Sequence, residues 1–97
     1  MAREIYRGEI EPLLASGALL IDVREGSDHN GEDGLPGHTH LPLSRINELR
    51  SRLTNSIPVI FYCRSGLLSF KAAEIVAGWT EQPVYYLAGG LVSYVNP

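Results

Sequence analysis

The chain has 97 residues, of which 44% are hydrophobic and 20% are charged, and its formal net charge is −3. This length suits one domain with a single core, and we expect that domain to span residues 1–97. The acidic balance and the lack of a Lys/Arg run disfavour nucleic-acid binding, because such a chain cannot neutralise a row of phosphates. The single cysteine excludes an intramolecular disulfide and fits a reducing compartment.

The N-terminal residues MAREIYRGEIEP contain no apolar segment of the kind that directs secretion. The longest apolar stretch, Leu13 to Val23, is interrupted by polar residues and is too short to span a bilayer. We therefore expect a cytoplasmic protein with no membrane partner.

The first third of the chain alternates between strand and helix patterns. We expect a short edge strand over Glu4–Tyr6, then a helix over Gly8–Ala15 that tolerates Pro12 only in its first turn. Ala18–Val23 is almost continuously apolar, as parallel strands buried on both faces are. The glycine-rich segment 26–37 is predicted to be a loop.

The middle of the chain predicts a short strand and a helix. The strand covers Thr39–Leu43, and Ser44 then caps a helix over Arg45–Leu53 with Glu48 as its capping partner.

The last third of the chain repeats the alternation. Ile57–Tyr62, opened by Pro58, has the composition of a buried central strand, and the helix after it carries apolar residues at helical spacing. Val84–Leu87 is the last strand, and Gly89 and Gly90 start a final short helix. The whole pattern predicts an α/β fold: a mostly parallel sheet of about five strands, connected by right-handed crossovers and covered by helices on both faces.

The most informative segment is the one around Cys63, which lies between the central strand and the following helix. A helix N-terminus presents unpaired N–H groups and the positive end of its dipole, so it favours a thiolate there. Free cysteines are more often small buried hydrophobes. The neighbouring Arg64, Ser65, Gly66 and Ser69 are poor core residues and good anion-binding residues, and this favours a catalytic thiol.

Two chemistries could use such a loop, and both begin with attack by the thiolate. Cysteine phosphatases place an arginine at the sixth position after the cysteine, where this chain has Ser69. The loop also looks one residue short of enclosing a phosphate. A persulfide chemistry needs only a thiolate and N–H donors, without a metal or redox cofactor, and it remains the better match.

Four motifs then resemble one family, the single-domain rhodaneses or thiosulfate sulfurtransferases. They are LLIDVRE at 19–25, GLPGHTHLPL at 34–43, VIFYCRSGLLS at 59–69 and YLAGGLVSY at 86–94. The resemblance implies a rhodanese-like domain in which Cys63 takes a sulfane sulfur from thiosulfate or a related persulfide donor. It also implies transfer of that sulfur to cyanide or a thiol, with a protein as a further possible acceptor.

On this interpretation the anionic sulfur is held by the backbone N–H groups of the loop, formed by Arg64, Ser65, Gly66, Leu67, Leu68 and Ser69. Arg64 and Lys71 supply local positive potential. Asp22 and Arg24 are expected to form an ion pair that supports the loop, rather than to act as acid and electrophile.

The chain also departs from the family pattern. Leu68 stands where the loop often has arginine, Gly34 where histidine is common, and His38 where alanine is common. If the loop is exposed, Leu67 and Leu68 form an apolar lip. His29, His38 and His40 have no spacing that would converge on a metal, and we expect no metal site.

Two alternatives to the enzyme remain open at this point. The first is a non-enzymatic sulfur-relay or sensing module that accepts a persulfide from a partner protein, and the missing arginine at Leu68 favours it. The second, a cysteine phosphatase or arsenate reductase, is weakened by Ser69.

Overall fold

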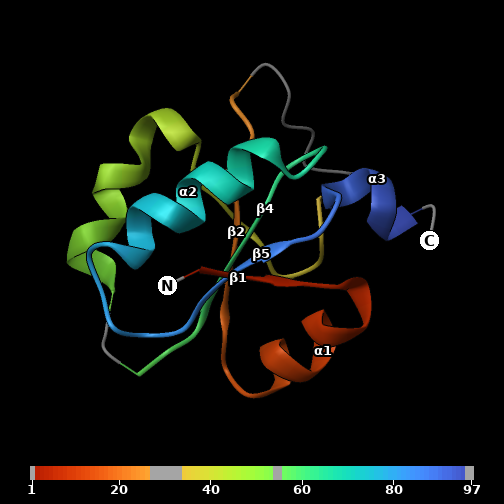
Figure 1. Cartoon of the computed structure of the whole chain (residues 1–97), viewed down its shortest axis with the longest axis horizontal. Helices are drawn as coiled ribbons and strands as arrows, with labels where there is room; N and C mark the ends of the chain where they lie inside the picture. Colours follow the sequence, from red (N-terminus) through yellow and green to blue (C-terminus); the bar gives the residue numbers. More distant parts are fainter. Residues whose placement is uncertain (1, 27–33, 54–55, 96–97) are drawn as a thin grey trace.

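The central feature of the fold is a parallel sheet with β4 in its middle (Figure 1). The computed structural model describes residues 2–26, 34–53 and 56–95. Its strands are β1 (Ala2–Ile5), β2 (Leu19–Asp22), β3 (Thr39–His40), β4 (Val59–Tyr62) and β5 (Val84–Leu87). They pair in parallel in the order β1-β5-β4-β2-β3. The predicted α/β fold with about five parallel strands is confirmed.

Helices cover both faces of this sheet. They are α1 (Arg7–Ala15), the 3₁₀ helix η1 (Leu43–Arg52), α2 (Leu67–Ala77) and α3 (Gly90–Val95). One buried cluster joins β4 to η1 and α2, and a second cluster joins β4 to α1 and α3 (Figure 1). No helix over the described residues has the length and apolarity that crossing a membrane requires.

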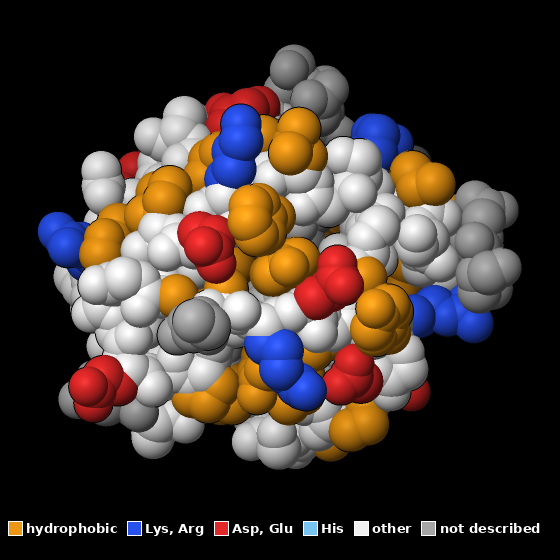
Figure 2. All heavy atoms as spheres, in the orientation of Figure 1, with side chains coloured by type: hydrophobic (Ala, Val, Ile, Leu, Met, Phe, Trp, Pro, Cys, Tyr) orange, Lys and Arg blue, Asp and Glu red, His pale blue; other side chains and the backbone are white. Residues whose placement is uncertain are grey.

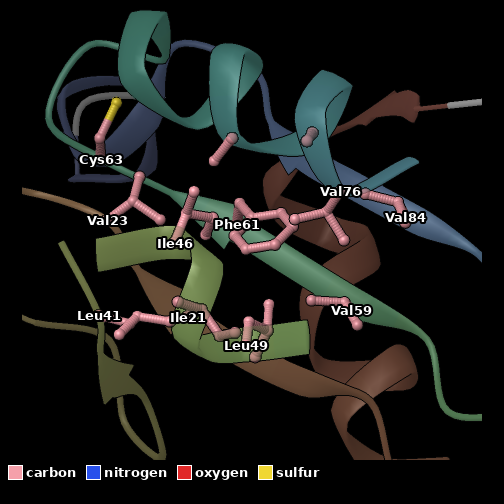
Figure 3. Packing of buried hydrophobic residues seen from close by; sticks show 12 residues of the cluster. Ile21, Val23, Leu41, Ile46, Leu49, Val59, Phe61, Cys63, Val76 and Val84 are labelled. Atoms are coloured by element: carbon pink, nitrogen blue, oxygen red, sulfur yellow. The ribbon is translucent and has the colours of Figure 1, made fainter. Parts of the chain in front are cut away.

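Strand β4 shows why the sheet is buried on both sides. Val59 and Phe61 point into the cluster under η1 and α2, whereas Ile60 and Tyr62 point into the opposite cluster. All four residues are buried, as expected of a central parallel strand. Cys63 continues the first set and lies at the upper end of that cluster (Figure 3).

The segment predicted as a helix over Arg45–Leu53 differs from expectation. It is a 3₁₀ helix that begins two residues earlier, with Pro42 at its N-cap and a non-helical Arg45 at φ −114°. Ser44 does not cap it, because its hydroxyl and its N–H both donate to the Glu25 carboxylate, at 2.8 and 3.0 Å. Glu48 instead accepts hydrogen bonds from the Arg45 guanidinium, at 2.7 and 2.8 Å.

The prediction for Pro12 was also wrong. Helix α1 begins at Arg7, which places Pro12 in its second turn rather than its first. Proline lacks the N–H that would donate to the Gly8 carbonyl. Gly8 is exposed, so water can satisfy that carbonyl.

Several predicted boundaries also move. The edge strand ends at Ile5, because the N–H of Tyr6 donates to the Glu9 carboxylate at 2.9 Å and starts α1. The strand expected over Thr39–Leu43 stops at His40. Within the predicted loop 26–37, residues 27–33, and with them His29, lie outside the described residues.

Candidate active site

The thiol of Cys63 lies under the first turn of α2 (Figure 3). Its sulfur accepts hydrogen bonds from the N–H of Gly66 at 3.2 Å and from the N–H of Ser69 at 3.3 Å. The Ser69 hydroxyl lies 3.6 Å from the sulfur and donates to the Gly66 carbonyl at 3.1 Å. Only 2% of Cys63 is exposed. The sulfur therefore belongs to a nearly buried residue and accepts hydrogen bonds from two backbone N–H groups.

The turn between β4 and α2 depends on Gly66. Its φ of +99° lies in the left-handed region, which side chains other than glycine rarely adopt. A Cβ at this position would also lie 3.3 Å from the backbone nitrogen of Gly89. The turn can thus fold back toward Cys63 only because residue 66 has no side chain.

The start of α3 holds the other side of this loop. The N–H of Leu91 donates to the Cys63 carbonyl at 2.9 Å, and the N–H of Val92 donates to the Arg64 carbonyl at 3.1 Å. Gly90 has a φ of +60°, and a Cβ there would overlap the Cys63 carbonyl oxygen and lie 2.6 Å from that of Arg64. Backbone contacts from a segment distant in sequence therefore fix the loop.

Sequence reasoning assigned Gly89 and Gly90 only to the start of a helix. Their contact with the cysteine loop was missed. The available signal was the glycine pair directly after a buried strand, since two adjacent glycines often mark a close approach of two backbones.

The ion pair predicted between Asp22 and Arg24 is present next to this loop. Asp22 pairs in register with Tyr62, the residue before Cys63. Its carboxylate accepts the Arg24 guanidinium at 2.7 Å and the Arg24 N–H at 3.0 Å. Burial alone would raise the pKa of Asp22, but the hydrogen bonds from Arg24 and Tyr62 outweigh burial and lower it. Both members of the pair are buried.

Tyr62 connects this ion pair to the segment before β3. Its hydroxyl accepts the N–H of Leu35 at 3.0 Å. The pKa of Tyr62 is raised above its ordinary value, mainly by burial and also by the charge of Asp22. A neutral tyrosine hydroxyl therefore bridges the two segments.

Gly34 and His38, the two unusual residues before β3, are sterically coupled. A Cβ on Gly34 would lie 2.8 Å from Nδ1 of His38 and would overlap the neighbouring Cε1 of the ring. That ring packs edge-on against Tyr62, with centroids 6.2 Å apart, and its Nδ1 lies 2.8 Å from the Leu35 carbonyl. The histidine thus occupies space that only a glycine at residue 34 leaves open.

The remaining predicted site residues divide into exposed and buried ones. Arg64, Ser65 and Lys71 are exposed, and Ser69 is fully buried. Leu67 is 60% exposed. Leu68, in contrast, is half-buried and packs against the cluster that contains Cys63. The predicted apolar lip therefore consists of Leu67 and not of Leu68, because successive residues of a helix point about 100° apart.

Across 2–26, 34–53 and 56–95 there is no group of three or more metal-binding side chains. His40 lies with Nε2 2.7 Å from the Arg24 carbonyl. This contact ties β3 to the segment that carries the buried ion pair.

The model of the rhodanese-like domain family matches residues 7–97. The chain belongs to this family. The four motifs that suggested a rhodanese correspond to β2, the segment around β3, the β4–α2 loop and the β5–α3 junction. The resemblance inferred from the sequence is confirmed.

Individual relatives agree with this assignment. The uncharacterized protein YqhL of Bacillus subtilis strain 168 is 36% identical over 75 residues, which cover 75% of this chain and 57% of YqhL. A rhodanese homolog from Thermus thermophilus is 31% identical, with a TM-score of 0.71, over 94% of this chain and 99% of that chain. A thiosulfate sulfurtransferase from Pseudomonas aeruginosa has a TM-score of 0.82 over 99% of this chain and 18% of that chain. At 23% identity the last comparison supports the shared fold alone.

Proposed function

We propose that this rhodanese-like domain is a sulfurtransferase that carries a sulfane sulfur as a persulfide on Cys63. The observation that carries the proposal is the pair of backbone N–H groups, from Gly66 and Ser69, aimed at the cysteine sulfur at 3.2 and 3.3 Å. Such donors stabilise negative charge on sulfur without neutralising that charge in an ion pair. A thiolate held in this way stays available for attack.

The proposed reaction has two steps that balance without a cofactor. In the first, the Cys63 thiolate attacks the outer sulfur of thiosulfate, the sulfur–sulfur bond of the donor breaks, and sulfite leaves with the electron pair. In the second, cyanide or a thiolate attacks the outer sulfur of the persulfide and regenerates the Cys63 thiolate. Both steps pass through an anionic sulfur that the loop donors can stabilise.

The near burial of Cys63 fits this chemistry. With 2% of the residue exposed, a donor has to reach the thiolate with a small atom rather than a bulky group. Persulfide formation moves the reactive atom about 2 Å away from the original sulfur. That displacement would bring the transferred sulfur closer to an acceptor outside the loop.

The same loop is a weaker match for phosphate chemistry. The position that a phosphatase fills with arginine is Ser69, whose side chain is fully buried and already donates to the Gly66 carbonyl. This position therefore supplies no guanidinium that could bind two phosphate oxygens.

The direct test is the release of thiocyanate from thiosulfate and cyanide, for wild type and for Cys63→Ala. We expect turnover by wild type and none by the variant, while circular dichroism shows the same fold for both. Turnover that survives in Cys63→Ala would overturn the proposal. A persulfide that forms on wild type without turnover would instead favour the relay module, in which a partner protein delivers or accepts the sulfur.

A further inference from the structure

The face of the molecule that carries α2 has exposed aromatic and acidic side chains close to the cysteine loop. Tyr6 is 62% exposed and Phe70 is 43% exposed, and the Phe70 ring meets the Tyr86 ring edge-on with centroids 5.3 Å apart. We call Tyr6, Phe70 and Tyr86 the aromatic surface. Figure 2 shows that hydrophobic side chains on this face lie next to acidic ones.

Two carboxylates border the aromatic surface. Glu4 pairs in register with Tyr86 across β1 and β5, and it accepts the Tyr6 hydroxyl at 3.3 Å. Glu74 lies four residues after Phe70 on α2, so the two side chains share one face of the helix. Burial and the charges of Glu4 and Glu74 raise the pKa of Tyr86. Among the described residues, Glu74 forms no ion pair. The surface therefore combines aromatic rings with negative charge, a combination that attracts lysine and arginine side chains.

The aromatic surface begins one helical turn after the active-site loop. The N–H of Phe70 donates to the Gly66 carbonyl at 3.0 Å, and the N–H of Gly66 donates to the Cys63 sulfur. Leu67, at 60% exposure, lies between them in sequence. A molecule bound over Phe70 and Leu67 is thus next to the first turn of α2, beneath which the thiol lies.

We propose that the aromatic surface binds a protein acceptor whose cysteine is flanked by lysine or arginine side chains, and presents that cysteine to the persulfide on Cys63. That the acceptor carries a thiol follows from the proposed sulfur transfer, on which this inference rests. That the thiol is flanked by basic residues is inferred from Glu4, Glu74 and the three aromatic rings. Glu4 and Glu74 would repel a small anionic acceptor at the aromatic surface. A basic protein segment would gain both cation–π contacts and charge complementarity.

The test uses two synthetic peptides with one central cysteine, flanked in one by lysines and in the other by glutamates. Protein loaded beforehand with persulfide is mixed with each peptide or with 2-mercaptoethanol, and the rate of sulfur transfer is measured. We expect the lysine peptide to react about fivefold or more faster than the glutamate peptide. Equal rates, or a faster glutamate peptide, would overturn the inference.

A charge-reversal pair locates the effect. Glu74→Lys should lower the rate with the lysine peptide about fivefold and leave the rate with 2-mercaptoethanol within about twofold. Glu81→Lys is the matched control, because Glu81 is exposed and lies beyond the far end of α2. Equal losses in both variants would mean that net charge, and not this surface, governs the preference.

A serine version of the lysine peptide separates this inference from the proposed function. Its binding is followed by chemical-shift changes of the backbone amides of Phe70 and Tyr86, which need no sulfur chemistry. Binding there, without persulfide formation by any donor, would support the surface while the proposed transfer fails. Transfer without binding at these residues would overturn the surface and leave the transfer in place. A dimer that Glu74→Lys disrupts would assign the surface to a second copy of the chain, which also overturns the inference.

Discussion

Two adjacent strands of the sheet end in an anionic or potentially anionic group, and the two groups are held in different ways. At the end of β2, the Asp22 carboxylate is bound by the guanidinium and the backbone N–H of Arg24. At the end of β4, the Cys63 sulfur is bound by the backbone N–H groups of Gly66 and Ser69. Both residues are nearly inaccessible to solvent.

The difference explains why one group is structural and the other is the candidate nucleophile. A carboxylate paired with a buried guanidinium has its charge neutralised, so it stabilises the loop and is poorly placed to react. Backbone N–H donors carry no net charge, so they would leave the charge and lone pairs of a thiolate at Cys63 available for attack on an electrophilic sulfur. At this end of the sheet, the type of donor therefore distinguishes the structural group from the candidate nucleophile.

The largest expected effect is on protein stability, through the buried ion pair between Asp22 and Arg24. Arg24→Ala leaves Asp22 buried without its partner, and we expect a loss of about 3 to 5 kcal/mol in the free energy of unfolding. Urea denaturation measures this loss. Arg45→Ala is the control, because the Arg45–Glu48 pair has the same 2.7 Å distance but is exposed. A similar loss in both variants would contradict the structural role of the buried pair.

The next effect concerns the link between α3 and the loop. Gly90→Ala forces a side chain against the Cys63 and Arg64 carbonyls, and a loop displaced by about 1 Å can lower kcat/KM about a hundredfold. Gly17→Ala is the matched control, since Gly17 also has a positive φ but a Cβ there would meet no atom within 4 Å. Thiocyanate release and urea denaturation are measured for both. Equal losses of kcat/KM would show that backbone strain alone is responsible.

A smaller effect should appear in the pH dependence of stability. The folded protein holds the pKa of Asp22 below its ordinary value of 3.8. The ionised carboxylate therefore contributes its full stabilisation above that value, and the contribution is lost as the pH falls through the lower pKa of the folded state. Between about pH 6 and pH 2.5, Asp22→Asn should flatten the decline in unfolding free energy. Glu48→Gln, at an exposed ion pair, should leave most of the decline in place.

The smallest effect is expected from placing a guanidinium near the Cys63 sulfur, as Arg24 places one near the Asp22 carboxylate. Leu68→Arg adds a guanidinium to the first turn of α2, and we expect kcat/KM for thiosulfate to rise about fivefold, with a smaller gain at high salt. Leu68 packs against the core, so some stability is lost as well. Leu67→Arg, at a more exposed position, is the comparison. An equal gain with a neutral polysulfide would contradict the charge argument.

The sequence predicted the parts of this comparison that depend on local pattern. The buried runs gave the strands, the turn at Ser65 and Gly66 gave the position of the thiol, and the spacing of Asp22 and Arg24 gave the ion pair. Each of these rests on residues close in sequence. Periodicity and turn composition are sufficient for them.

The parts that it missed depend on distant contacts. Ser44 could not be excluded as a cap without Glu25, which lies 19 residues earlier and binds its hydroxyl. The role of Gly90 required its approach to the Cys63 carbonyl. The burial of Leu68 depends on where α2 begins, because a shift of one residue rotates each side chain by about 100°.

The most direct test of the account is the mass of the intact protein after incubation with thiosulfate, followed by peptide mapping. The account predicts the gain of one sulfur atom, located on Cys63, removed by cyanide, and absent from Cys63→Ser. An unmodified Cys63 after exposure to thiosulfate, polysulfide and a protein persulfide would contradict it, and would leave the cysteine as a buried core residue.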